Sequence, residues 1–224
     1  PLTADFHKVF ANVKGNYVEY ETAGDLRYNP TGLIRVHLRG GNPQLGPSDG
    51  VVHRFDPATK ADLGGENLAI GPAWRDDAGN WHRLADYSPR QPPAVQVLEE
   101  SPDKVAFAVT YTGDFDGATR IQETITLTAG GVTVRSSVAG PEIGSIRMYY
   151  PMLVFDGLEE TQVELIGNSV RLSLRDGAVR FTLEAPPGVR LERSGHRLDF
   201  RNGLAEALVA DIPGSAATFS LRAE

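Results

Sequence analysis

The sequence RIQETITLTAGGVTVRSSV, residues 120–138, decides the fold of this chain. Side chains that suit a core alternate with polar ones from 121 to 128 and again from 132 to 138, which is the period of a strand with one buried face. Between the two arms, Gly130-Gly131 can adopt the positive φ angles that a tight hairpin turn needs. A two-residue loop at these glycines predicts the pairs Leu127 with Val134, Ile125 with Ser136 and Glu123 with Val138. The stretch therefore predicts an antiparallel sheet that is covered on one face.

The composition indicates one folded domain. The 224 residues are 41% hydrophobic, which is enough for one sizeable core, and no linker or repeat divides them. We therefore expect a single domain over residues 1–224. Because the chain begins at Pro1 without an initiator methionine, we expect a processed product or a piece of a larger enzyme.

Charge and motifs exclude several classes of function. The net charge of -7 argues against a nucleic-acid partner, and no apolar run has the length of a membrane span. The absence of cysteine excludes disulfides and thiolate metal sites. Residues 113–117, GDFDG, resemble the opening of a calcium loop, but Ile125 stands where the closing carboxylate belongs. No phosphate-binding, dinucleotide-binding or zinc motif occurs, so we expect no metal and no cofactor.

The frequent turn residues predict many short strands. Helical periodicity is almost absent, and 24 glycines and 15 prolines divide the chain. The resulting count of about fifteen strands is too high for an immunoglobulin-like sandwich and fits a large antiparallel two-sheet sandwich. Within the strand expected at 146–155, Pro151 predicts a sheet edge or a bulge.

The first candidate site is a row of cationic side chains on the strand expected at 32–39. Arg35, His37 and Arg39 alternate with apolar residues, so they project from one face at intervals of about 7 Å. Guanidinium groups bind carboxylates or sulfates in a planar fork, and an imidazole exchanges protons near neutral pH. A glycine-rich loop follows, after which His53 returns to the same neighbourhood. The alternative is a solvated strand face without a ligand.

The second candidate is an aromatic group around the turn expected at 76–79. Trp74, Trp81 and His82 flank this turn. Exposed indole rings stack on the apolar faces of sugars, whereas buried ones cap a hydrophobic core, and both alternatives are open here.

Two further positions complete the candidate set. Tyr149 and Tyr150 point to opposite sides of their strand, so at most one of them lines a cleft, and we assign substrate binding to Tyr149. Glu123 lies in the inward register of the hairpin, where a carboxylate must be paired or have a raised pKa. It is either a structural hydrogen-bonding group or, if this face lines a cleft, an acid or base.

The stretch 74–155 resembles the galactose-mutarotase-like β-supersandwich superfamily. The resemblance is carried by the strand after Val95, by RIQETITLTAGGVTV and by RMYYPMLVF at 147–155. NPTGLIRVHLRGG, residues 29–41, is similar to the opening of β modules in bacterial glycan-degrading enzymes. In that superfamily such domains often form the C-terminal module of polysaccharide lyases and glycoside hydrolases whose catalytic half is an (α/α) toroid.

One member of that superfamily fits less well. Aldose epimerases use a histidine acid in an Asn-His-aromatic setting and a late catalytic glutamate. This sequence has no such histidine context, and Glu206 is late in the chain but has different surroundings. The departure favours a module that supports the carbohydrate site of another domain.

Three hypotheses follow. The first is a carbohydrate-recognising module of a hydrolase or lyase that acts on an acidic glycan. The second is a stand-alone mutarotase-like epimerase that uses His37 or His53 as acid and Glu123 or Glu206 as base. The third is a structural or oligomerisation module without a ligand. Across the hypotheses, the candidate catalytic residues are His37 and Glu123, and the candidate substrate-binding residues are Arg35, Arg39, His53, Trp74, Trp81 and Tyr149. The partners expected are a carbohydrate, together with an upstream catalytic domain or a second copy. The compartment is open, and the resemblance is compatible with the bacterial periplasm or exterior.

Overall fold

The computed structural model describes residues 6–26, 29–46, 50–51, 58, 67–200 and 202–224. Its first strands are β1 Lys8–Val13, β2 Asn16–Glu21, β3 Gly32–His37, β4 Gly50–Val51, β5 Asn67–Leu68, β6 Gly71–Arg75, β7 Trp81–Arg83, β8 Ala94–Glu100 and β9 Lys104–Phe115. The later ones are β10 Ala118–Thr128, β11 Gly131–Ala139, β12 Ser145–Phe155, β13 Gln162–Ile166, β14 Ser169–Leu174, β15 Gly177–Glu184, β16 Glu192–Phe200, β17 Gly203–Pro213 and β18 Ala216–Ala223. A short 3-10 turn, η1, spans Leu84–Asp86. This confirms the prediction of an all-β protein, and none of the described segments is a helix with the length and hydropathy of a membrane span.

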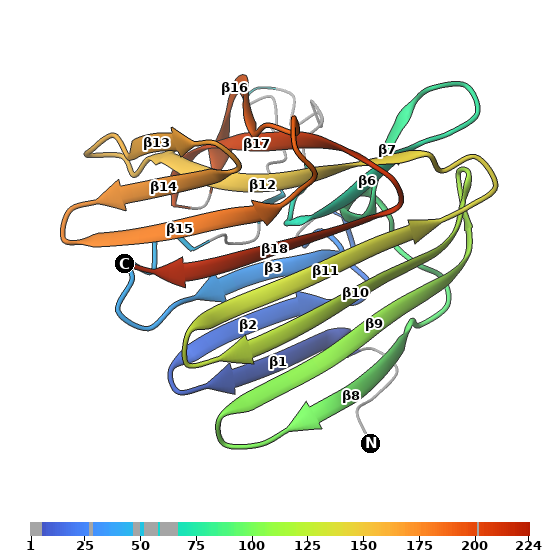
Figure 1. The fold of residues 1–224 in the computed structure, drawn as a ribbon, viewed down its shortest axis with the longest axis horizontal. Coiled ribbons are helices and arrows are strands. Elements are labelled where there is room, and N and C mark those ends of the chain that lie inside the picture. The colour runs from blue at the N-terminus through green and yellow to red at the C-terminus, as the bar shows by residue number, and fades with distance from the viewer. Residues whose placement is uncertain (1–5, 27–28, 47–49, 52–57, 59–66, 201) are drawn as a thin grey trace.

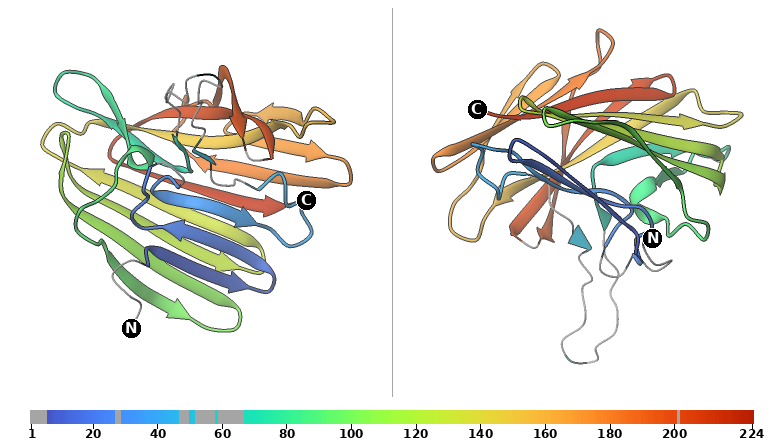
Figure 2. Two further views of the ribbon diagram at one scale, coloured as in Figure 1. Left: turned by 180° about the vertical axis from the view of Figure 1, so that it is seen from behind. Right: turned by 90° about the horizontal axis from the view of Figure 1, so that it is seen from below.

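The strands form a two-layer antiparallel sandwich. One layer is a sheet of eight strands in the order β13-β14-β15-β18-β11-β10-β9-β8. The second layer contains a three-stranded sheet, β1-β2-β3, and a five-stranded sheet, β16-β17-β12-β6-β7. Figure 1 shows the eight-stranded sheet in front of the other two, and the end view in Figure 2 shows the layers apart. A bridge between Leu33 and Ile70 links the two sheets of the second layer.

The β10–β11 hairpin lies in the middle of the eight-stranded sheet and faces the core. Its alternation is as predicted, since every second residue from Ile121 to Leu127 is buried. The predicted turn was misplaced by one residue, so each predicted partner was wrong by two residues. Thr128 pairs with Gly131, so the loop is Ala129-Gly130. The observed pairs are Leu127 with Val132, Ile125 with Val134 and Glu123 with Ser136.

Gly131 explains the correction. It has a φ of 131°, and a Cβ placed on it would lie 2.1 Å from the carbonyl oxygen of Leu221 on β18. This glycine is therefore needed inside β11, where a neighbouring strand approaches closely, and not in the loop.

Pro151 lies where β12 loses one neighbour. β6 pairs with β12 only from Ile146 to Tyr149, whereas β17 continues past Pro151 to Phe155. The proline thus sits beyond the β6 ladder, as the expected edge position requires. This ending of the ladder leaves space on the outer side of the five-stranded sheet.

Replacing Gly131 by alanine should destabilise the protein by about 2–4 kcal/mol, because the new methyl group collides with backbone at a positive φ. The matched control is Gly130→Ala, whose Cβ would meet only the Thr128 hydroxyl at 3.6 Å. Urea denaturation of both variants measures the difference. Equal midpoints for the two would contradict the assigned register.

Candidate functional site

The predicted cationic row lies on the outer face of the three-stranded sheet. Arg35 forms an ion pair with Glu19, in which Arg35 Nη1 lies 3.1 Å from Glu19 Oε2. The His37 ring lies 5.9 Å from the ring of Tyr17, and burial and the nearby guanidinium of Arg35 lower the pKa of His37. Arg39 follows the end of β3, where its Nη1 reaches the carbonyl oxygen of Lys14 at 3.5 Å. Arg35 and His37 share one face of β3, the charge of Arg35 is neutralised by Glu19, and His53 lies outside the described residues.

Trp74 is a core residue and does not offer a ring face to a sugar. Its side chain is fully buried, and its indole N–H donates to the carbonyl oxygens of Phe115 at 2.9 Å and Asp116 at 3.1 Å. Its ring stacks on Tyr87 at 5.6 Å. The substrate-binding assignment is corrected here, because the inward register of β6 places this indole between the two layers.

Glu123 is fully buried between the layers. Its carboxyl group accepts hydrogen bonds from the hydroxyls of Tyr20 and Ser136, both at 2.7 Å. Burial raises the pKa of Glu123 to about 7, although these two hydrogen bonds act in the opposite direction. Of the two alternatives, the structure shows the buried hydrogen-bonding group, and a ligand does not reach it.

A different surface gathers the groups that suit a glycan. It is the outer face of the five-stranded sheet, where Arg75, Trp81, Arg83, Arg147 and Tyr149 project; we call these five residues the arginine–aromatic face. Trp81 pairs with Arg75, Ala73 lies between Arg83 and Arg147, and Gly71 pairs with Tyr149. Since paired residues share a face of the sheet, all five project together. The small side chains on β6 leave room between them.

The arginines of this face lie over aromatic rings. The guanidinium carbon of Arg75 is 4.6 Å from the Trp81 ring centroid, and that of Arg147 is 4.2 Å from it. Arg83 lies over Tyr149 at 5.3 Å. Cation–π contacts of this kind hold a guanidinium in place, so that its N–H groups point in fixed directions.

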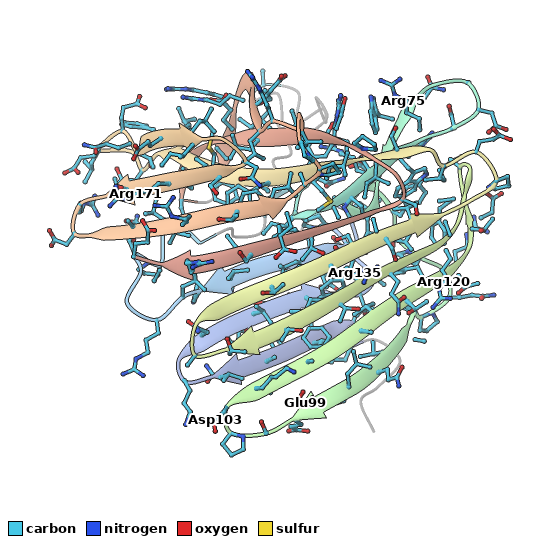
Figure 3. All side chains as sticks on the ribbon, in the orientation of Figure 1. Arg75, Glu99, Asp103, Arg120, Arg135 and Arg171 are labelled. Atoms are coloured by element: carbon cyan, nitrogen blue, oxygen red, sulfur yellow. The ribbon has the colours of Figure 1, made fainter. Side chains whose placement is uncertain are left out.

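The three arginines differ in their carboxylate partners. Arg147 forms a two-pronged ion pair with Asp211 of β17, and Arg83 forms one with Asp86 of η1. Arg75 forms no ion pair within the described part of the chain, and Figure 3 shows its side chain at the exposed β6–β7 hairpin. Arg75 is therefore the arginine of this face without a hydrogen-bonded carboxylate partner among the described residues, although its charge also helps to lower the pKa of Asp211.

Two hollows flank the face. The Tyr149 hollow is small and mostly apolar, and it is lined by Asn67, Ala69, Gly71, Pro72, Arg83, Ala85, Tyr149, Pro151 and Ala207. The Arg190 hollow is wider and is lined by Arg147, Asp211 and Pro213, by Val209 and Ala210, and by Pro187–Arg190 and Glu192. Arg147 and Tyr149 stand between the two hollows, since they are neighbours on the same face of β12.

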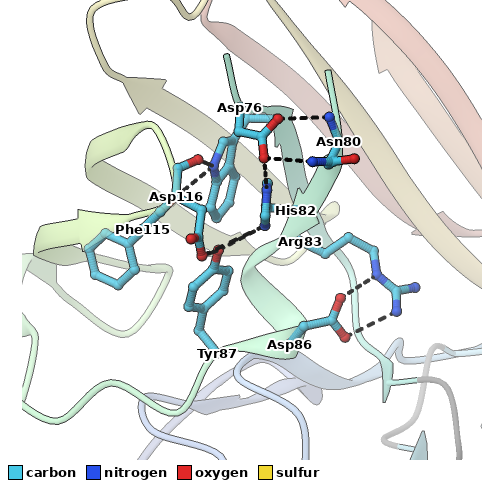
Figure 4. Close-up of polar contacts among 9 residues, drawn as sticks. Asp76, Asn80, His82, Arg83, Asp86, Tyr87, Phe115 and Asp116 are labelled. Atoms are coloured by element: carbon cyan, nitrogen blue, oxygen red, sulfur yellow. Dashed lines mark hydrogen bonds and ion pairs between the residues drawn. The ribbon is translucent and has the colours of Figure 1, made fainter. Parts of the chain in front are cut away.

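A chain of polar contacts crosses the open end of the sandwich beside this face (Figure 4). His82 Nε2 lies 2.9 Å from Asp76 Oδ2, and His82 Nδ1 lies 3.2 Å from the Tyr87 hydroxyl. The Tyr87 hydroxyl donates to Asp116 Oδ2 at 2.5 Å. The chain thus joins β7 of the five-stranded sheet to the β9–β10 turn of the eight-stranded sheet.

The pKa values of Asp76 and Tyr87, at the two ends of this series of polar contacts, are shifted in opposite directions. Hydrogen bonds from His82 and Asn80 hold the pKa of Asp76 well below its usual range. Burial, together with the hydrogen bond to Asp116, raises the pKa of Tyr87. Tyr87 therefore remains a proton donor at neutral pH. It also lines a third hollow, formed with Ser88–Gln91 and Thr112–Phe115, which we call the Tyr87 hollow.

Sequence reasoning found part of this site. Trp81 and Tyr149 were candidates, and the structure brings them to one face; the arginines beside them were missed. The signal was available, because a hairpin at 76–79 pairs position 75 with 81 and position 73 with 83. The pairing of β6 with β12, which adds Arg147, is not readable from local sequence.

No protein-family model matches the sequence, and no curated protein shows significant similarity to it. Several solved structures are similar to this one in fold. A heparan sulfate lyase from Pedobacter heparinus aligns with a TM-score of 0.58 and 11% identity over 99% of this chain and 37% of the lyase chain. A 4-alpha-glucanotransferase from Thermococcus litoralis aligns with a TM-score of 0.58 and 13% identity over 99% of this chain and 40% of that one. A heparinase III gives a TM-score of 0.54 at 7% identity, over 100% of this chain and 36% of its own.

These likenesses concern the fold. The chain has the galactose-mutarotase-like β-supersandwich fold, as its sequence resemblance implied. It spans about two fifths or less of the length of the three proteins named above.

Replacing Glu123 by glutamine should flatten the dependence of stability on pH. Because the pKa of Glu123 is about 7 in the folded protein and 4.5 is its ordinary value, the folded state binds the proton more tightly. The free energy of unfolding of the wild type should therefore fall by about 3 kcal/mol, relative to Glu123→Gln, as pH rises from 4.5 to 7. Urea denaturation from pH 4.5 to 8 measures this. The control is Glu184→Gln, which removes an exposed carboxylate at the end of β15. Parallel profiles for the wild type and Glu123→Gln would contradict the assignment.

Proposed function

We propose that this chain is a carbohydrate-binding module of a glycan-degrading enzyme, a hydrolase or a lyase, and that the arginine–aromatic face binds acidic groups of the glycan. The observation that carries the proposal is the layering of three arginines on Trp81 and Tyr149 in a chain whose net charge is -7. In an acidic protein, an anionic ligand is attracted only where cationic groups are gathered.

The geometry suits carboxylates and sulfates. A guanidinium that lies over a ring is already ordered, so binding an anion costs less conformational entropy than ordering a free arginine would. The N–H edges of the guanidinium match two oxygen atoms of one anion. The Tyr149 hollow beside them is mostly apolar but has room for little more than one water molecule, so a sugar ring would lie across its rim and not inside it.

The structural likenesses support a module of a larger enzyme. The proteins that share the fold are named for lyase and transferase activities on glycans, and this chain corresponds to less than half of each. The proposed partners are therefore an acidic glycan and a catalytic domain. The cationic row with Arg35, His37 and Arg39 is a second surface on which the same ligand class can be tested.

Replacing Arg75 by alanine should weaken binding to heparin about fivefold, because this variant removes the one charge of the face that has no carboxylate partner. Binding should also weaken as salt rises, since exposed charges are screened over about 10 Å at 0.1 M. Isothermal titration with heparin, and with amylose as the neutral glycan, measures both effects.

The matched control is Arg135→Ala. Arg135 is an exposed arginine of β11 on the outer side of the eight-stranded sheet, as Figure 3 shows, and its removal changes the net charge equally. Equal affinity of Arg75→Ala and Arg135→Ala for heparin would contradict the proposed face, and absence of binding by the wild type would contradict the proposed function.

A second candidate function is acid–base catalysis on a sugar, such as the anomerisation of an aldose. The chain from Asp76 through His82 to Tyr87 favours it, because a carboxylate that orients an imidazole beside a hydroxyl is a common arrangement for proton transfer. Tyr87, which lines its hollow, would give a proton to the ring oxygen. Asp116 follows the lining residue Phe115 and accepts from the Tyr87 hydroxyl, so its exposed carboxylate would take a proton from the hydroxyl on C1. No net proton is consumed.

Replacing Tyr87 by phenylalanine should abolish any acceleration of aldose anomerisation by this protein, because the hydroxyl that donates the proton is lost while the ring that packs on Trp74 is kept. Polarimetry of freshly dissolved glucose measures the rate, and thermal unfolding checks that the variant is folded. A wild type that leaves the spontaneous rate unchanged would eliminate this candidate without touching the glycan-binding proposal.

A further inference from the structure

The Arg190 hollow continues the arginine–aromatic face toward β16. Arg147 lies over Trp81 and also lines this hollow, so the two features share one side chain. The opposite wall is the loop Pro187–Arg190, which leads from the eight-stranded sheet into β16. A ligand that binds at Arg75, beside Trp81, and extends along the sheet past Arg147 therefore enters the Arg190 hollow.

Arg190 is an exposed cation at the far end of this surface. In the described part of the chain it forms no ion pair, and the same holds for Arg75 at the near end. Arg147, between them, is neutralised by Asp211. The surface thus has one available guanidinium at each end and a neutral ion pair in the middle.

The two available cations are too far apart for one anion. Arg75 is on β6, and β12 and β17 lie between it and the loop that carries Arg190. Neighbouring strands are about 4.8 Å apart, so the backbone positions of the two arginines are separated by about 10 Å or more across the strands. One carboxylate or sulfate can therefore pair with Arg75 or with Arg190, but not with both at once.

We infer that Arg190 is a second anion-binding position and that the ligand of this surface is an oligosaccharide with at least two anionic groups, bound across the strands from Trp81 to Arg190. The inference rests on the proposed function and adds to it the length and charge spacing of the ligand. Binding at two linked positions raises the affinity for a chain above that for its single unit, because the second contact is made within the complex.

Glu192 opposes an anion in the same hollow. It lines the hollow beside Arg190, and within the described residues no cation pairs with it. A negative charge there disfavours an anionic group that is not seated on Arg190, so Glu192 contributes to the selection of charge spacing. Removing its charge and removing that of Arg190 must therefore change affinity in opposite directions.

The test compares heparin-derived disaccharide and octasaccharide in isothermal titration. Replacing Arg190 by alanine should weaken octasaccharide binding about tenfold and leave disaccharide binding within about twofold, because the shorter ligand can stay on Arg75 and Trp81. Glu192→Gln should strengthen octasaccharide binding about threefold. Arg135→Ala serves as the charge-matched control, with an expected change of less than about twofold for either ligand.

The outcomes distinguish a failure of the second anion-binding position from a failure of the proposed function. Equal losses for the two ligands on Arg190→Ala, or no loss for either, would overturn the second position while Arg75→Ala still tests the proposed function. Weaker octasaccharide binding by Glu192→Gln would also overturn it. If the wild type binds neither ligand, the proposed function fails and this inference fails with it.

Discussion

The whole structure depends on one constraint, which is that a β-strand turns successive side chains to opposite sides. In the eight-stranded sheet one side must fill the space between the layers, so Ile121, Ile125 and Leu127 are buried while the threonines between them face water. The same constraint carries Glu123 into the core, where it is tolerated because the Tyr20 and Ser136 hydroxyls meet its carboxyl group.

In the five-stranded sheet the same constraint separates the two tryptophans. On its inner side Trp74 packs against the rings of the core. On its outer side Trp81, which pairs with Arg75, contacts the guanidinium groups of Arg75 and Arg147. Both tryptophans flank one short turn, yet one stabilises the sandwich and the other orders a charged surface. The surface exists because β12 and β17 bring Arg147 and Asp211 beside the hairpin.

Features that depend on residues close together in the sequence could be predicted, and features that depend on distant residues could not. Alternation and turn residues are local, so the all-β architecture and the inward position of Glu123 were correctly predicted. The turn of the central hairpin was misplaced because the reason for Gly131 is the carbonyl of Leu221, ninety positions later in the chain. Trp74 and Trp81 could not be told apart by composition, since only the pairing of β6 with β12 and β7 defines which side is covered. Arg147 was missed for the same reason.

The separation of the two sides of β6, β7 and β12 has a consequence for how such proteins diverge. Inward positions are held by packing, whereas outward positions meet only solvent or ligand, so the latter are free to drift without loss of the scaffold. Structures with 11% and 13% identity to this chain retain its arrangement of strands. The packing that maintains the architecture and the side chains proposed to bind a glycan therefore lie on opposite sides of the same strands, so substitutions can change the second set without disturbing the first.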